Sequence, residues 1–381
     1  MKITKIETFQ VPPRWLFLRM ETDEGVVGWG EPVVEGRADS VAAAVAEMSD
    51  YLIGQDASRI EDHWQVLTKG GFYRGGPVFS SAVAGIDQAL WDIKGKALGV
   101  PVYELLGGAV RDKVRMYTWI HGDRPEELAE STRIAMAAGF DAVKFCPATK
   151  VAPLDTAASI RSMVNNLAAV REAGGESLDI ALDFHGRFTP AMSRRVLPLM
   201  EEFLPMFAEE VVVPELSADL GLITQATSIP IATGERLYSR WDFRTVLGNG
   251  VSVVQPDLSH AGGISEVRRI AAMAETYGAL LAPHCPLGPI ALAASLQVDI
   301  ASPNFLIQEQ SRGAEYTQGP DLFDYLVDPV VFDMGTGYIN RPLAAGLGIE
   351  IDEDKVRFEA ETPHHWRNAI WRQDDNSFLE W

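Results

Sequence analysis

Six polar residues recur at nearly regular intervals in the C-terminal half of the chain, each at the end of a short apolar run typical of a β-strand. They are Asp183, Glu209, Glu235, Asp257, His284 and Glu309. Successive members are 22 to 27 residues apart, the length of one strand plus a crossover helix. The carboxyl ends of the strands of a (β/α) barrel meet at one face, where such barrels place their chemistry. The spacing therefore predicts an enzyme whose polar side chains converge on one point.

From about Val114 onward, β-branched or aromatic runs alternate with helical patterns rich in Ala, Leu, Arg and Glu, which is typical of parallel βα units. The predicted strands are Val114–Trp119, Ala142–Phe145, Leu178–Asp183, Met206–Glu209, Ile229–Thr233, Val251–Gln255, Leu280–Pro283 and Phe305–Gln308. Eight such runs fit a closed barrel better than an open sheet. We therefore predict an α/β fold with a TIM-type barrel over residues 113–320.

The N-terminal part of the chain follows a different pattern. Residues 3–31 are predicted to form antiparallel strands around the turn signal Thr22-Asp23-Glu24-Gly25. Helical spacing of apolar residues follows over Ser40–Leu52, Arg59–Lys69 and Phe79–Leu98. This predicts a separate α+β unit over residues 1–112. The tail, residues 321–381, is expected to fold back onto that unit.

Charge and composition exclude several classes of partner. The formal net charge of −20 argues against nucleic acid and anionic membranes, because binding either requires a basic surface. Only two cysteines occur, Cys146 and Cys285, without the spacing of a disulfide framework or a zinc motif, and the start of the chain lacks the core of a signal peptide. These features predict a cytoplasmic location. The apolar stretch from Tyr277 to Val298 contains three prolines and a histidine, so we interpret it as a strand, a loop and a helix.

Three of the regularly spaced residues are candidate metal ligands. Asp183, Glu209 and Glu235 offer carboxylate oxygens, a hard ligand set suited to Mg²⁺. Strand alternation predicts that His185 lies on the same side as Asp183. Only one residue of the Glu209-Glu210 pair can point inward, and the regular spacing selects Glu209. Taken singly, each carboxylate could equally be a solvated loop acid.

The remaining three residues are candidates for proton transfer. Asp257 beside His284 can fix the tautomer of the histidine and raise its basicity. Alternatively, His284 is a hydrogen-bonded core histidine and Asp257 a helix N-cap. Glu309 completes the ring, and its alternative is a salt bridge with Arg312.

Longer motifs around these residues carry a family resemblance. They are Asp183-Phe184-His185-Gly186-Arg187, Gly234-Glu235-Arg236, Gln255-Pro256-Asp257-Leu258-Ser259-His260-Ala261-Gly262-Gly263-Ile264, Pro283-His284-Cys285-Pro286-Leu287-Gly288-Pro289 and Gln308-Glu309-Gln310. They resemble the mandelate racemase subgroup of the enolase superfamily, and most of all its acid-sugar dehydratases that act on D-galactonate. The likeness spans nearly the whole chain. It implies a modified (β/α)₇β barrel beneath an α+β N-terminal capping domain, here called the cap.

The resemblance also implies roles for these residues. The carboxylates of Asp183, Glu209 and Glu235 would hold Mg²⁺. His284, paired with Asp257, would take the proton from C2 of the acid sugar. His185 would protonate the departing C3 hydroxyl, and Glu309 would help to stabilise the enediolate. Family habit further implies a homo-oligomer, a dimer or an octamer.

Substrate contacts are expected from the cap and from the second strand of the barrel. The candidates are Arg14, Trp15, Tyr73, Arg74, Lys144 and Cys146. Cys146 stands where dehydratases of this kind have Asn and racemases have Lys, and the loop 147–155 also departs from the dehydratase pattern. A dehydratase for a different acid sugar, such as gluconate, therefore remains an alternative.

Three other functions are compatible with parts of the pattern. A racemase or epimerase of a 2-hydroxy acid would use the same enolate, but the Lys expected on the second strand is replaced by Cys146. A zinc-dependent barrel hydrolase would need His-x-His at the end of the first strand, where Trp119-Ile120-His121 stands. A non-catalytic relative would have little reason to keep all six barrel-end residues.

Overall fold

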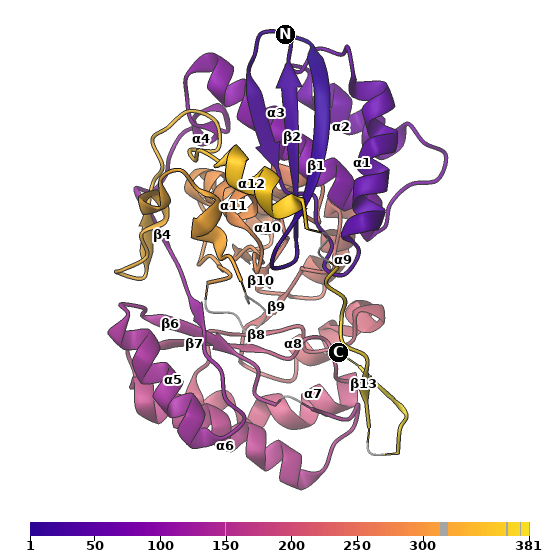
Figure 1. The fold of residues 1–381 in the computed structure, drawn as a ribbon. Helices are drawn as coiled ribbons and strands as arrows, with labels where there is room; N and C mark the ends of the chain where they lie inside the picture. Colours follow the sequence, from indigo (N-terminus) through magenta and orange to yellow (C-terminus); the bar gives the residue numbers. More distant parts are fainter. Residues whose placement is uncertain (149, 313–318, 363–364, 374, 381) are drawn as a thin grey trace.

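The computed structural model describes residues 1–148, 150–312, 319–362, 365–373 and 375–380. The cap lies over one end of the barrel (Figure 1). Its antiparallel sheet has the order β1-β2-β3. The elements of the cap are β1 (Ile3–Val11), β2 (Trp15–Thr22), β3 (Val27–Gly30), α1 (Ala38–Leu52), α2 (Ile60–Lys69) and α3 (Pro77–Leu98). The antiparallel strands predicted over residues 3–31 are confirmed, and the three predicted helices are confirmed within two residues at each end.

Close contact between β3 and α3 depends on glycine. A Cβ on Gly30 would lie 1.9 Å from the carbonyl oxygen of Gly85, and a Cβ on Gly28 would lie 2.2 Å from that of Ala89. The strand can therefore approach the helix backbone more closely than any side chain would allow. This contact sets the position of Glu31, the residue that follows the strand.

The barrel sheet is parallel, with the order β11-β10-β9-β8-β7-β6-β5. Its strands are β5 (Thr118–Trp119), β6 (Ala142–Phe145), β7 (Asp179–Asp183), β8 (Phe207–Glu209), β9 (Ile231–Thr233), β10 (Val253–Val254) and β11 (Leu280–Leu281). The eighth predicted run, Phe305–Gln308, forms bridges from Phe305 to Leu281 and from Gln308 to Met116. These bridges join the two edges of the sheet and close the barrel, as predicted.

Side chains from all eight runs fill the interior of the barrel. They form one buried cluster of Tyr117, Ala142, Ala181, Phe207, Ala232, Val253, Ala282 and Ile307. Four of the eight are alanines, because the interior of a small barrel has room for only a few large side chains. This packed layer supports the ring of strand ends above it.

The structure corrects the first predicted strand, Val114–Trp119, which is split in two. Its beginning forms β4 (Lys113–Arg115), which pairs antiparallel with β12 (Tyr338–Asn340) outside the barrel. Only β5 belongs to the barrel sheet. The N–H of Met116 donates to the carbonyl of Gly337, so the C-terminal segment competes for this part of the strand. Periodicity alone could not reveal a partner more than 200 residues away.

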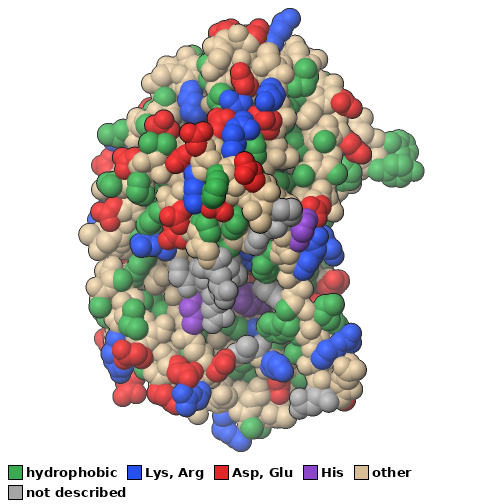
Figure 2. All heavy atoms as spheres, in the orientation of Figure 1, with side chains coloured by type: hydrophobic (Ala, Val, Ile, Leu, Met, Phe, Trp, Pro, Cys, Tyr) green, Lys and Arg blue, Asp and Glu red, His purple; other side chains and the backbone are tan. Residues whose placement is uncertain are grey.

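Helices cover the outside of the barrel. They are α5 (Pro125–Ala137), α6 (Ala157–Gly174), α7 (Pro190–Val196), α8 (Gly221–Thr224), α9 (Arg240–Gly248), α10 (Gly263–Thr276) and α11 (Pro289–Ala301), with α4 (Val102–Leu105) in the connection from the cap. Among the described helices, we find none with the length and apolar character needed to span a membrane. Acidic and basic side chains are interspersed over the face shown in Figure 2, without an extended basic patch.

The C-terminal segment returns to the cap. Helix α12 (Glu353–Ala360) lies against β1 (Figure 1). Arg19 of β2 pairs with Glu353 at 3.0 Å, and the hydroxyl of Tyr325 donates to the carbonyl of Pro12 at 2.8 Å. The short strands β13 (Trp371–Arg372) and β14 (Phe378–Leu379) follow.

Buried polar contacts fix the cap to the barrel. The carboxylate of Asp87 on α3 accepts from the backbone N–H of Ser265 at 2.9 Å, in the first turn of α10. The carboxylate of Glu31 accepts from the backbone N–H groups of Gly288 and Ala291, at the start of α11. Unpaired N–H groups at a helix N-terminus favour such anionic partners. Two carboxylates of the cap therefore bind the N-termini of α10 and α11, the helices that begin where the loops after β10 and β11 end.

The close approach of β3 to α3 generates the first prediction. Gly30→Ala should lower the free energy of unfolding by about 1–3 kcal/mol, because the added methyl collides with the backbone of α3. Gly248→Ala is the matched control, since a Cβ there meets nothing within 4 Å, and should change stability by less than about 0.5 kcal/mol. Denaturant unfolding measures both, and equal stabilities would contradict the packing described here.

Candidate active site

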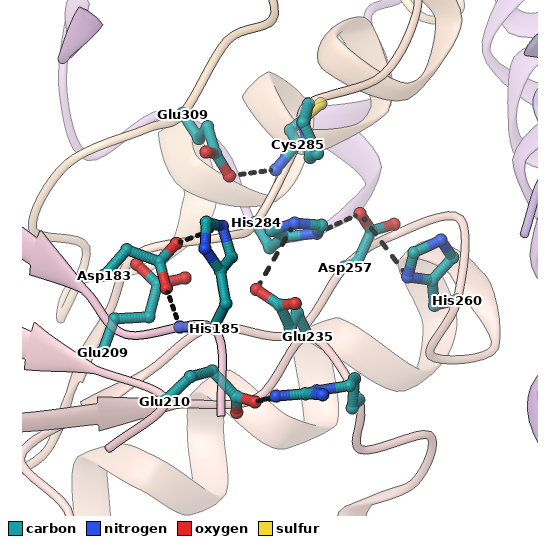
Figure 3. A network of polar contacts seen from close by, with 12 residues as sticks. Asp183, His185, Glu209, Glu210, Glu235, Asp257, His260, His284, Cys285 and Glu309 are labelled. Atoms are coloured by element: carbon teal, nitrogen blue, oxygen red, sulfur yellow. Dashed lines mark hydrogen bonds and ion pairs between the residues drawn. The ribbon is translucent and has the colours of Figure 1, made fainter. Parts of the chain in front are cut away.

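Three carboxylates meet at the ends of neighbouring barrel strands. Asp183 ends β7 and Glu209 ends β8, where the two residues are paired in register. Glu235 lies two residues beyond the end of β9. One oxygen from each carboxylate lies within 4.8 Å of the other two. Figure 3 shows the three side chains turned toward a common region.

Electrostatics at this cluster favour a cation. Burial raises the pKa of Glu209 well above its ordinary value, and Asp183 raises it further. Burial also raises the pKa of Glu235. In the described part of the chain, Oε1 of Glu209 is buried and has no hydrogen-bond partner. An unpaired buried carboxylate oxygen is costly, so the donor set fits a divalent metal ion with oxygen ligands.

Lys144 on β6 supplies one positive charge to the cluster. Its Nζ atom lies 2.8 Å from Glu209, 3.0 Å from Glu309 and 3.5 Å from Asp183, and its side chain is fully buried. Burial lowers the pKa of Lys144, but Glu209 and Glu309 raise it well above its ordinary value. The lysine is therefore a fixed cation among the carboxylates.

Glu210 points away from the cluster of the three carboxylates, as the spacing predicts. Its φ of 50° turns the chain, and its carboxylate pairs with Arg236 and accepts from the hydroxyl of Thr233. Gly186 must lie beside this pair without a side chain, because a Cβ there would overlap the guanidinium of Arg236. Only Glu209 of the two adjacent glutamates therefore enters the cluster.

His185 reaches the cluster by a route that differs from the prediction. Strand β7 ends at Asp183, and His185 has a φ of 51°, in the left-handed region that few non-glycine residues adopt. Its N–H donates to Asp183 at 2.8 Å, and its Nε2 lies 3.4 Å from the same carboxylate. The two residues are neighbours, but a strained turn brings them together rather than strand alternation.

An indole ring supports His185. The ring of Trp119, at the end of β5, is stacked on His185 with 5.9 Å between centroids and 3° between planes. Its Nε1 donates to Glu309 at 2.8 Å. Burial lowers the pKa of His185, and the carboxylate of Asp183 opposes that shift. Trp119 therefore fixes both a histidine and a carboxylate of the site.

His284 and Asp257 form the predicted pair. Nδ1 of His284 lies 2.8 Å from Oδ2 of Asp257, and its Nε2 lies 3.5 Å from Glu235 (Figure 3). The other oxygen of Asp257 accepts from the N–H of Ser259 at 2.6 Å. Burial lowers the pKa of His284, but the carboxylates of Glu235, Glu309 and Asp257 raise it well above its ordinary value. The aspartate favours a proton on Nδ1 and leaves Nε2 facing the cluster.

Glu309 has three polar partners among the described residues. Besides Trp119 and Lys144, it accepts from the backbone N–H of Cys285 at 2.9 Å. Burial raises the pKa of Glu309, but Lys144, His284 and the Cys285 N–H together outweigh this effect and lower it below its ordinary value. Arg312 instead lies 3.8 Å from Asp321. The alternative of a Glu309–Arg312 salt bridge is therefore wrong.

The structure separates the substrate-contact candidates of the cap. Arg14 is buried at the cap–barrel junction, with its guanidinium 3.4 Å from the carbonyl of Pro286 and 3.7 Å from Glu35. Trp15 lies in the cap core against Phe17. Tyr73 and Arg74 are exposed, with 91% of Tyr73 accessible to solvent. The structure therefore places Arg14 beside a barrel loop, buries Trp15 and leaves Tyr73 and Arg74 exposed to solvent.

Cys146 follows β6 and faces Arg187. The guanidinium Nη2 of Arg187 donates to Sγ of Cys146 at 2.7 Å and to the carbonyl of Ala148 at 3.0 Å. Burial raises the pKa of the Cys146 thiol. At the position where the chain departs from the dehydratase pattern, Arg187 thus binds both Cys146 and the start of the 147–155 loop. Residue 149 of this loop lies outside the described residues.

Sequence reasoning missed three residues of this site. Trp119 ends a barrel strand, so its place in the ring could have identified it. His260 lies three residues after Asp257, and its Nδ1 is 3.8 Å from that carboxylate. Glu35 comes from the cap and lies 3.2 Å from Nε2 of His260. No spacing in the sequence connects Glu35 to the barrel.

Comparisons with known proteins agree with this architecture. Residues 127–355 match the enolase C-terminal domain-like family, and residues 5–107 match the mandelate racemase/muconate lactonizing enzyme N-terminal domain. A D-galactonate dehydratase from Ralstonia pickettii (strain 12J) is 52% identical over 382 residues, covering all of both chains. The chain thus has the two-domain form of a barrel enzyme with a cap, and it belongs to the mandelate racemase/muconate lactonizing enzyme family of the enolase superfamily.

Solved structures show the same fold. An enolase from Agrobacterium radiobacter, crystallised with Na and L-malate, is 31% identical with a TM-score of 0.91, and the match covers all of both chains. A candidate dehydratase from Mesorhizobium loti is 31% identical with a TM-score of 0.89, covering 94% of this chain and 98% of the other. Together with the Ralstonia relative, these matches identify the protein as an enzyme of the hydro-lyase class.

The burial of Lys144 generates the second prediction. In metal-free protein, Lys144→Met should lower the free energy of unfolding by about 3 kcal/mol, because three carboxylates lose their buried counter-ion. Lys355→Met, which breaks an ion pair with Glu359 on the surface of α12, should cost less than about 1 kcal/mol. Thermal unfolding in EDTA measures both. Equal effects of the two substitutions would contradict this account of Lys144.

Proposed function

We propose that this enzyme is a Mg²⁺-dependent acid-sugar dehydratase that converts D-galactonate to 2-dehydro-3-deoxy-D-galactonate. The observation that carries the proposal is the convergence of one carboxylate cluster with two histidines, each in contact with a carboxylate of that cluster. The 52% identity to a D-galactonate dehydratase supports the choice of substrate. The Agrobacterium relative was solved with L-malate, itself a 2-hydroxy acid.

Asp183, Glu209 and Glu235 would hold the metal ion through oxygen atoms. A bound Mg²⁺ supplies positive charge that neutralises the three carboxylates and stabilises the negative charge developing on a substrate carboxylate. Such help is needed because a proton beside a carboxylate is very weakly acidic. Lys144 on β6 pairs with Glu209 and with Glu309 and offsets part of the negative charge of the cluster.

His284 would remove the C2 proton. Its Nε2 faces the cluster, while its Nδ1 is engaged by Asp257. The N–H of Ser259 holds the aspartate in place through its second oxygen, so the ring has one favoured orientation. The pair therefore offers a base with a defined tautomer at the point where the substrate carbon would lie.

His185 would protonate the C3 hydroxyl as it leaves. Its contact with Asp183 places it beside the cluster, on a different strand from His284. Stacking on Trp119 holds the plane of the ring, and the same indole binds Glu309. Two histidines, one from the loop after β7 and one from the loop after β11, can thus act in succession, one removing a proton from carbon and the other delivering one to oxygen. Glu309, fixed by Trp119 and the Cys285 N–H, would help to stabilise the enediolate by donating a hydrogen bond, once the negative charge of the bound substrate raises its pKa so that it becomes protonated.

Substrate selectivity would depend on the loop after β6 and on Arg14. Cys146 accepts a hydrogen bond from Arg187, so it presents a thiol rather than an amide to this side of the site. Losing one buried hydrogen bond reduces discrimination by about 1–3 kcal/mol. We therefore expect D-galactonate turnover with relaxed selectivity toward an epimer such as D-gluconate.

The carboxylate cluster generates the third prediction. Exhaustive chelation should abolish dehydration of D-galactonate, and Mg²⁺ should restore it. Glu235→Gln should raise the Mg²⁺ concentration needed for half-maximal activity at least about tenfold, because one anionic ligand is lost. Glu215→Gln, at an exposed glutamate, is the control and should leave that concentration unchanged. The assay measures 2-keto product; full activity after chelation would refute the metal requirement.

The two histidines generate the fourth prediction. His185→Asn should lose dehydration by at least about a hundredfold yet still exchange the C2 proton of galactonate with solvent deuterium, because His284 remains. His284→Asn should lose both reactions. His63→Asn, at a buried histidine of the cap, should retain both. NMR of the substrate in D₂O follows exchange, and the opposite pattern in the first two variants would reverse the assignment.

A further inference from the structure

We infer that Glu35 and His260 are positioning residues that connect the cap to the catalytic base through the chain Glu35–His260–Asp257–His284. The inference rests on the proposed role of His284 and extends it to residues outside the ring of barrel ends. His260 would hold Asp257 from behind, and Glu35 would hold His260. Neither residue would touch the substrate.

The geometry of the chain is continuous. Oδ2 of Asp257 lies 2.8 Å from Nδ1 of His284 and 3.8 Å from Nδ1 of His260, so one carboxylate oxygen faces both imidazoles. Nε2 of His260 lies 3.2 Å from Oε2 of Glu35. The two imidazole rings are 6.0 Å apart (Figure 3). Asp257 therefore occupies a bridging position between a ring that faces the site and a ring that faces the cap.

At the cap end of the chain, Glu35 and His260 carry opposite charges. Burial lowers the pKa of His260, but Asp257 and Glu35 together raise it to about 9, so its ring carries a positive charge near neutral pH. Burial raises the pKa of Glu35, but His260 and Arg14 lower it well below its ordinary value. The imidazolium of His260 attracts the carboxylate of Asp257 and so helps to fix its position. The same carboxylate oxygen also faces His284. Because His260 and Glu35 carry opposite charges, the ionisation of each depends on the other.

The chain crosses from one domain to the other. Glu35 lies in the loop between β3 and α1, whereas His260 lies in the loop between β10 and α10. The cap also grips the second loop through its backbone: the indole N–H of Trp64 donates to the carbonyl of Gly262, and the amide of Gln88 donates to that of Leu258. Correct placement of the base therefore depends on a docked cap.

Kinetics of the intact enzyme test the chain. His260→Asn should lower kcat about ten- to a hundredfold with KM changed less than about threefold, and it should increase the deuterium isotope effect measured with C2-deuterated galactonate, because proton abstraction becomes slower. Glu35→Gln should lower kcat about three- to tenfold in the same manner, and Glu35→Asp should restore part of it. The double variant should be no slower than His260→Asn, because both changes break one chain.

His63→Asn is the matched control. His63 is a buried histidine of the cap, bonded to Tyr51 and to the carbonyl of Asp56 at 2.9 Å each, so its loss perturbs packing without reaching the base. It should leave the isotope effect unchanged even if thermal stability falls. A raised KM with an unchanged isotope effect in His260→Asn would overturn the inference, as would multiplicative effects of the two substitutions on kcat.

A second measurement separates this inference from the proposed function. If the unmodified enzyme turned over no acid sugar, the proposed function would fail, yet the contact could still be tested by thermal unfolding of Glu35→Gln, His260→Asn and the double variant. Coupling requires that the double variant lose less stability than the two single variants together. Additive losses would overturn the chain whatever the substrate.

Discussion

Repulsion among buried carboxylates at the centre of the barrel is the constraint on which the rest of the site depends. Asp183, Glu209 and Glu235 lie too close together to remain charged without a positive partner. Lys144 supplies one such charge from β6, and the same ammonium group also pairs with Glu309. The pKa values of Glu209 and Glu235 stay raised beside this lysine, so a bound cation would complete the charge balance of the cluster.

The cap contributes to this site through the loops of the barrel. Asp87 and Glu31 occupy the N-termini of α10 and α11, and so fix the two loops that carry Asp257 and His284. Gly30 allows β3 to lie close enough to α3 for Glu31 to reach its partners. Through these contacts, the packing of the cap supports the loops that carry Asp257 and His284, although the folds of the two domains are distinct.

Much of this arrangement could be predicted from local pattern. The period of 22 to 27 residues identified the ring of barrel ends, because one strand and one helix have a fixed combined length. The choice of Glu209 over Glu210 followed from the same period, and the proximity of Asp257 to His284 followed from adjacent strands. Local pattern could not predict the close approach of β3 to α3 at glycine, nor the split of Val114–Trp119 into β4 and β5. Each of these features depends on a partner that is distant in the chain.

The sequence by itself determined the barrel, the cap and the six polar strand ends, because hydrophobic period and strand-end position are local properties that the chain carries wherever it folds. Tertiary structure alone decided which further residues join them. It placed Trp119 on His185 through a left-handed turn, Trp15 in the cap core, and Glu35 beside His260. The contacts of Trp119 with His185 and of Glu35 with His260 join residues that are distant in the chain, and the contact of Glu35 with His260 also depends on how the two domains dock.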